Sequence, residues 1–108
     1  MDERERRIGL NEAVFREANE RIQELNETFA TFTDELVLVC ECGDAKCVEK
    51  IAMPPAAYEE LRSDPAHFAI APGHQIPDVE QVIAQRDGYE VVKKHGIPRQ
   101  VAELTDPR

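Results

Sequence analysis

The chain has 108 residues, which is enough for one domain with a single hydrophobic core and too short for two. Apolar residues make up 42% and charged residues 32%, a composition typical of a globular protein rather than a disordered one. The formal charge of -9 has the wrong sign for binding phosphate-rich partners. Nucleic acid and membrane surfaces are therefore not expected as partners.

The chain contains no apolar run approaching the roughly 18 residues of a membrane span. Its first residues, Met-Asp-Glu-Arg-Glu-Arg-Arg, lack the apolar segment of a signal peptide. The sequence therefore predicts a cytoplasmic protein, in a compartment where cysteines stay reduced.

The first predicted element is a helix at about 8–30. Its apolar residues recur at helical spacing on one face: Ile8, Phe15, Ala18, Ile22, Leu25 and Phe29. Asn11 interrupts this stripe. Glu12 with Arg16, and Glu17 with Arg21, are i, i+4 pairs with the acid first, which favours an exposed helix face for both pairs.

The next two elements are strands that form a hairpin. Residues 36–40 are a short apolar run with two valines, and residues 48–53 make a second strand. The loop between them contains Gly43 and Asp44, residue types that tolerate turn dihedrals. This pairing places the cysteines at the hairpin tip.

Two further elements follow the hairpin. Pro55 fits the first turn of a helix, and Tyr58 and Leu61 continue it at helical spacing, so a short helix is predicted to about residue 63. Residues 67–71 then form a short strand that ends at the turn signal Pro72-Gly73.

The last third of the chain has two interpretations. Pro77, with Val79, Val82 and Ile83 at helical spacing, predicts a helix at 77–86. The rival is a hairpin that turns at Asp87-Gly88, since this dipeptide is typical of tight β-turns. In either case residues 89–94 form a final strand, and 96–108, with two prolines, form a loosely attached tail.

Together these elements predict an α+β fold. It has a long N-terminal helix, a small, mainly antiparallel sheet with a zinc-knuckle-like hairpin, and two short helices. Residues 1–95 form one zinc-binding domain, and residues 96–108 form the tail.

Three cysteines, Cys40, Cys42 and Cys47, lie within eight positions and indicate a metal site. An odd number of cysteines in a reducing compartment argues against a disulfide framework. Neighbouring ligands on tetrahedral zinc are roughly 3.7 Å apart, whereas residues i and i+2 of a strand are about 6.6 Å apart on one face. Cys40 and Cys42 must therefore lean together, and the four residues that follow let Cys47 return to the same point.

A structural zinc site needs a fourth ligand, and His74 is the best candidate among three histidines. His74 leaves a Pro-Gly turn in a loop and precedes the helix predicted at 77–86, whose positive end would favour a site of net negative charge. His67 lies in a predicted strand and His95 ends one. Asp44 or a water molecule stays open as an alternative.

The order of motifs also resembles that of a known group of proteins. The motifs are Asn11-Glu12, Phe15-Arg16-Glu17, Asn19-Glu20-Arg21-Ile22, Cys40-Glu41-Cys42-Gly43-Asp44 with Cys47, Tyr58-Glu59 with Arg62, Pro72-Gly73-His74, and Tyr89 with Val91-Val92. Across nearly the whole chain this is similar to small, acidic, uncharacterised actinobacterial proteins. The resemblance implies that Cys40, Cys42, Cys47 and His74 form one zinc site, and it implies no activity.

Three cysteines and a histidine close a zinc tetrahedron with soft ligands, which favours a structural ion, one per chain, and no catalytic residue. The sequence thus predicts a non-enzymatic protein-interaction module. One alternative is a zinc–thiolate redox switch, in which oxidation ejects zinc and pairs two cysteines. Another is a zinc-dependent hydrolase with Glu41 as general base, although a glutamate at a hairpin tip is usually solvated.

The apolar face of the first helix is the candidate surface for a protein partner. About 23 residues at 1.5 Å rise give roughly 35 Å, close to the diameter of about 34 Å of such a domain, so part of the helix could overhang. The candidate residues are Phe15, Ile22, Leu25 and Phe29, which could pair with a second copy, with Asn11 in the seam. Alternatively, the helix lies across the domain's own sheet.

Overall fold

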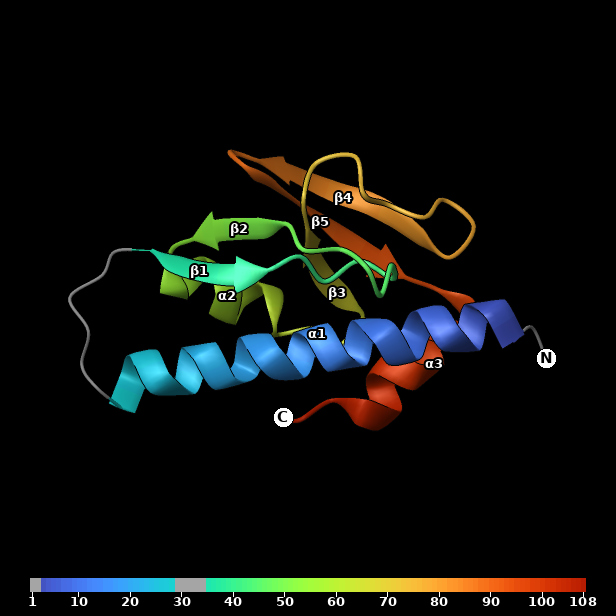
Figure 1. The fold of residues 1–108 in the computed structure, drawn as a ribbon, viewed down its shortest axis with the longest axis horizontal. Helices are drawn as coiled ribbons and strands as arrows, with labels where there is room; N and C mark the ends of the chain where they lie inside the picture. Colours follow the sequence, from blue (N-terminus) through green and yellow to red (C-terminus); the bar gives the residue numbers. More distant parts are fainter. Residues whose placement is uncertain (1–2, 29–34) are drawn as a thin grey trace.

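The computed structural model describes residues 3–28 and 35–108 and has the α+β architecture that the sequence predicts (Figure 1). The elements in chain order are α1 (Glu3–Thr28), β1 (Leu36–Val39), β2 (Lys50–Met53), α2 (Pro55–Leu61), β3 (His67–Ile70), β4 (Glu80–Arg86), β5 (Tyr89–Lys94) and α3 (Gly96–Thr105). Within the described residues no helix is long and apolar enough to cross a membrane.

The strands form two small antiparallel sheets. In the first, β1 pairs with β2, with Leu36 opposite Met53 and Val39 opposite Lys50. The second has the order β3-β5-β4. A residue just beyond β1 joins the sheets, because the Glu41 N–H donates to the Ala69 carbonyl of β3 at 2.8 Å.

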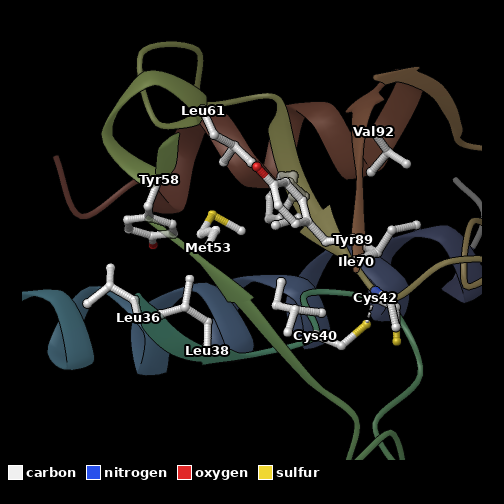
Figure 2. Packing of buried hydrophobic residues seen from close by; sticks show 14 of the residues in the cluster. Leu36, Leu38, Cys40, Cys42, Met53, Tyr58, Leu61, Ile70, Tyr89 and Val92 are labelled. Carbon is white, nitrogen blue, oxygen red and sulfur yellow. Dashed lines mark hydrogen bonds between the residues drawn. The ribbon is translucent and has the colours of Figure 1, made fainter. Parts of the chain in front are cut away.

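The apolar core lies between the two sheets and α2. Alternate residues of a strand share a face, and Figure 2 shows Leu36, Leu38 and Cys40 in a row that packs towards Met53, Tyr58, Leu61 and Ile70. Cys40 therefore continues the apolar row of β1, which brings its sulfur to the edge of the core.

Helix α1 runs along one side of both sheets, with α3 packed beside its N-terminal half (Figure 1). Its 26 residues span about 39 Å at 1.5 Å rise per residue, against a longest molecular dimension of 45 Å. The helix thus extends along nearly the whole molecule, as its predicted length indicated.

The buried face of α1 differs from the predicted one, because it is mostly polar. Apart from Ile8, its buried side chains are polar or charged: Glu12, Arg16, Asn19, Glu20 and Gln23. Glu17 and Arg21 form the predicted exposed pair at 2.9 Å. The exposed pair predicted for Glu12 and Arg16 is wrong, since both side chains are buried and have partners in the sheets.

Those partners explain why charged groups lie inside. The Arg16 guanidinium lies 3.5 Å from the centre of the Phe68 ring and donates to the carbonyls of Pro65 and His67. Lys94 is fully buried and donates to both Glu12 and Glu80. Buried charges are tolerated only when paired and hydrogen-bonded in this way.

The helix predicted at 77–86 is wrong, and the rival hairpin is confirmed. Strand β4 pairs with β5, with Val82 opposite Val92 and Arg86 opposite Tyr89. Gly88, in the turn, has a φ of 85°, a left-handed conformation that glycine adopts without steric cost. The pairing places Val82 of β4 opposite Val92 of β5. The helical spacing of Val79 and Val82 did not reveal this partner, because it lies in another strand.

The loosely attached tail predicted at 96–108 is also wrong, because α3 occupies most of it. Pro98 lies in the first turn of α3, where a missing N–H costs nothing. Pro98 and Ala102 are buried. Gly9 of α1 allows the close approach, since a Cβ there would lie 3.0 Å from the Cβ of Val101. α3 thus provides the second of the two short helices.

Candidate metal centre

Two loops bring the predicted ligands together. Cys40, Cys42 and Cys47 lie in the loop between β1 and β2, and His74 lies in the loop between β3 and β4. One ligand atom from each of these four residues lies within 4.8 Å of all the others. These residues could therefore hold a metal ion, and the predicted set is the one that the fold assembles.

Two of the distances within the cluster match those of tetrahedral coordination. The Nδ1 atom of His74 lies 3.6 Å from the Sγ atom of Cys40 and 3.6 Å from that of Cys47. Sulfur and nitrogen ligands on one zinc ion lie about 3.6 Å apart, given bonds near 2.3 Å and 2.05 Å at a tetrahedral angle. Nδ1 is thus the imidazole atom placed to bind.

Backbone hydrogen bonds shape the cysteine loop. The Cys40 N–H donates to the Glu49 carbonyl at 3.0 Å, and the Cys47 N–H donates to the Asp44 carbonyl at 3.0 Å. The Asp44 carboxylate accepts the Lys46 N–H at 2.9 Å. This turn returns Cys47 to the other two cysteines, and Asp44 stabilises the turn without belonging to the ligand cluster.

Helix α1 fixes the same loop at Gly43. The side-chain amide of Asn11 donates to the Gly43 carbonyl at 3.0 Å. A Cβ on Gly43 would lie 2.5 Å from Cγ2 of Ile8. Gly43 is not among the glycines with positive φ, so this position needs glycine for close approach to α1 rather than for the turn dihedrals.

The hydrogen bonds and burial of the three thiols shift their pKa values in different directions. The pKa of the Cys40 thiol is lowered by a hydrogen bond from Cys42 and by the Ala71 N–H, which donates to its sulfur at 3.1 Å. Donation to Cys40, together with burial, raises the pKa of Cys42, and burial raises that of Cys47. A metal ion that binds here displaces the thiol protons, because the thiolate is the form that binds metal.

The site lies at the edge of the core and faces solvent on one side. Figure 2 shows the sulfurs of Cys40 and Cys42 at the margin of the buried cluster. A hollow of about 250 Å³ beside them is lined by Cys42, Asp44, His74 and Ile76. Small molecules in solution can therefore approach the ligands from this side.

The other histidines lie elsewhere. His67 lies in β3 with its Nε2 atom 3.4 Å from Asp64, and His95 precedes the first turn of α3. His74 does not precede a helix, because the residues after it lead into β4. The predicted help from a helix N-terminus is therefore wrong, although His74 itself lies in one cluster with the three cysteines.

Glu41 does not lie exposed at a hairpin tip. Its side chain is fully buried, and its two carboxylate oxygens accept the Ala69 N–H and the Asn19 amide, each at 2.9 Å. The position of Glu41 between two cysteines gave no sign of this burial. Glu41 is buried because the alternation of the strand continues past Cys40 and turns its side chain towards α1 and β3.

The predicted partner face of α1 is only partly exposed. Phe15 and Ile22 are half-buried, and Ile22 packs against the core. Leu25 is 56% exposed. Phe29 lies outside the described residues. Leu10 and Val14 are also exposed apolar residues, and they were not part of the prediction. They lie on the same face as Leu25, because Leu10 and Val14 are four residues apart and Val14 and Leu25 are eleven apart.

The chain matches no protein-family model, and comparisons with curated proteins and with solved structures find no similar chain. The functional interpretation of the site therefore depends on its own geometry and chemistry.

Proposed function

We propose that this protein binds one zinc ion per chain through Cys40, Cys42, Cys47 and His74, and that the ion is structural. The observation that carries the proposal is the convergence of three sulfurs and one imidazole nitrogen within 4.8 Å. This donor set is typical of structural zinc sites, because soft thiolates and imidazole select zinc and fill the tetrahedron.

The position of the site in the fold supports a structural role. Its ligands come from two loops, one attached to each sheet, so an ion bound there links the two sheets. The chain has no Trp and only 6% aromatic residues, which leaves few large side chains for a core. A metal link contributes most to stability in small domains of this kind.

The surroundings of Glu41 argue against the hydrolase alternative. A catalytic zinc ion keeps one position open for water and needs a general base within reach of that water. The Glu41 carboxylate is instead bound to the Asn19 amide and the Ala69 N–H. It holds α1 and β3 against the cysteine loop, which is a structural task.

We further propose that the protein acts in the cytoplasm as a protein-interaction module and pairs with a second copy of itself through α1. The exposed stripe of Leu10, Val14 and Leu25 supports this part of the proposal. Light scattering over a range of concentrations tests it. We expect the wild-type mass to reach that of a dimer as concentration rises and the variant Leu25→Glu to stay monomeric; a wild-type mass that stays at the monomer value at every concentration would contradict pairing.

Metal analysis of protein purified without a histidine tag tests the zinc proposal. We expect about one zinc per chain in the wild type and a large loss in Cys42→Ser, because the variant lacks one thiolate ligand. The variant Lys46→Ala, at an exposed position in the same loop, serves as the control and should retain its zinc. Wild-type protein with little zinc and three freely reactive thiols would contradict the proposal.

A redox switch at the same site is a second candidate, favoured by the hollow that leads to Cys42 and His74. In the reaction, two zinc-bound thiolates and two protons reduce one hydrogen peroxide to two waters, form a disulfide and release the zinc ion. Treatment with peroxide should then release zinc in step with a mass loss of two hydrogens from the thiol form. Retention of zinc at peroxide levels that oxidise free cysteine would contradict this candidate.

A further inference from the structure

The loop that carries His74 is held at two points by buried carboxylates. The Gly73 N–H donates to Oε1 of Glu90 at 2.9 Å, and the Ile76 N–H donates to Oε2 of Glu80 at 3.1 Å. These two contacts lie on either side of His74 in the sequence. The exposed fractions of Glu90 and Glu80 are only 8% and 3%, so both are fixed within the fold.

Each carboxylate is itself held by a second partner. The other oxygen of Glu90 accepts the Gln85 amide at 3.1 Å, and Glu90 pairs in register with residues of both neighbouring strands in the middle of the sheet. The other oxygen of Glu80 accepts the Lys94 ammonium, which also donates to Glu12 of α1. A rigid sheet thus presents two acceptors to the His74 loop.

The His74 loop needs such support more than the cysteine loop does. It connects β3 to β4 through residues 71–79, and Gly73 has a φ of 84°. Most of the loop is exposed, including both prolines and the residues next to His74. A metal ligand must be held within about 0.5 Å of its place, and an exposed loop does not achieve this without outside contacts.

The cysteines are positioned by different contacts. Cys40 is held by the Glu49 carbonyl, and the cysteine loop is tied to α1 through Asn11 and Gly43. Loss of Glu90 would therefore disturb the histidine ligand while these contacts of the cysteine loop remain. This separation makes the role of the carboxylate testable.

We propose that Glu90, assisted by Glu80, is a positioning residue of the metal centre: it holds the 71–79 loop so that Nδ1 of His74 is the fourth ligand. The inference rests on the proposed zinc function. Hydrogen bonds from backbone N–H groups to a carboxylate are charge-assisted and roughly twice as strong as neutral ones, which suits this task. Groups that orient metal ligands typically contribute about 10–100-fold to metal affinity.

The first test measures Co²⁺ and Zn²⁺ affinity of the full chain under reducing conditions. The variant Glu90→Met keeps the length of the side chain and removes both acceptors. We expect its affinity to fall by about 10–100-fold, with a Co²⁺ absorption spectrum shifted in the direction that His74→Ala produces. The matched control is Gln85→Ala, which removes the other partner of Glu90, leaves the Gly73 contact in place, and should bind as the wild type does.

A double-mutant cycle separates positioning from general destabilisation. If Glu90 acts through His74, then Glu90→Met costs no further affinity once His74→Ala is present. Additive losses would overturn the inference, because they would show that Glu90 acts on the whole fold. The conservative variant Glu90→Gln keeps one acceptor and should recover most of the affinity and the wild-type spectrum.

Folding failure and failure of the proposed function remain distinguishable. If Glu90→Met does not fold, the same cycle with Glu90→Ala decides, because this smaller side chain also removes both acceptors, and losses that are additive with His74→Ala would overturn the inference. A wild-type chain that binds neither Co²⁺ nor Zn²⁺ would overturn the proposed function and this inference with it. Wild-type binding combined with additive losses would overturn this inference alone.

Discussion

Gly43 joins the metal loop to α1 and has no space for a side chain. A Cβ there would lie 2.5 Å from Cγ2 of Ile8 and 3.0 Å from Cδ1 of Ile76. We expect Gly43→Ala to lower the free energy of unfolding by about 1–3 kcal/mol, the usual cost of overpacking. Urea denaturation of the zinc-loaded protein measures this.

The second variant Ile8→Ala tests the stated cause of that loss. It makes room at the point of the clash, so Gly43→Ala should cost less in the Ile8→Ala background than in the wild type. Equal costs in the two backgrounds would show that the close approach is not what requires glycine.

Glu12 makes the free energy of unfolding depend on pH. Burial raises its pKa from an ordinary value of 4.5 to about 8, although the Lys94 ammonium acts in the opposite direction. One of its oxygens, Oε1, has no hydrogen-bond partner. The folded protein therefore retains a proton that the unfolded chain releases, so this group makes stability fall as pH rises from about 5 to 8.

The variant Glu12→Gln removes this titration and keeps an oxygen that can accept from Lys94. We expect the stability of the variant relative to the wild type to increase from pH 5 to pH 8 and then to level off. Urea denaturation at saturating zinc across this range measures the difference between the two proteins. Curves that run parallel would contradict the assignment of a raised pKa to Glu12.

At the scale of elements, α1 is bound to the sheets mainly by polar contacts. Arg16 provides the best example, since its guanidinium donates to the Pro65 and His67 carbonyls and covers the Phe68 ring. Replacement of Arg16 by Met leaves the part-buried carbonyls of Pro65 and His67 without this donor. We expect a loss of about 2–4 kcal/mol in the free energy of unfolding, which urea denaturation measures.

A change on the exposed side of α1 is the control for this prediction. Leu25 is 56% exposed, so at a protein concentration low enough for the wild type to be monomeric, Leu25→Glu should change stability by no more than about 0.5 kcal/mol. A larger loss for Leu25→Glu than for Arg16→Met would show that the apolar stripe predicted from the sequence, and not the polar face, holds α1 in place.

The contrast between those two faces shows what local patterns can and cannot predict. Glu12 and Arg16 have the spacing of an exposed ion pair, and the partner that buries Glu12 is Lys94, 82 residues away. No local pattern carries that information. The cluster with His74 was predictable because Cys40, Cys42 and Cys47 are close in sequence, and metal chemistry restricts which residue types could complete such a site.

Two errors in the last third of the chain have a similar cause. Val79, Val82 and Ile83 fit a helix by spacing, but Gly88 allows a turn that places β4 beside β5, and the pairing between strands decides the outcome. Pro98 looked like a sign of an irregular tail. It lies instead in the first turn of α3, a helix that depends on contact with α1.

The whole molecule combines two sheets, a polar helix interface and two loops that meet at one cluster of potential metal ligands. From the net charge of -9 and the small core we expect the fold to have limited stability of its own. A zinc ion held by Cys40, Cys42, Cys47 and His74 would link the loops of both sheets, and binding to such sites contributes on the order of 10 kcal/mol of apparent free energy.

The most direct test of whether zinc holds this fold together is a comparison of two melting temperatures. One is that of the zinc-loaded chain, and the other is that of the same chain after a strong chelator has removed the metal. We predict that the zinc-free protein melts at a much lower temperature or shows no cooperative transition, and that added zinc restores the original melting temperature. Equal melting temperatures with and without zinc would contradict the claim that the metal holds this fold together.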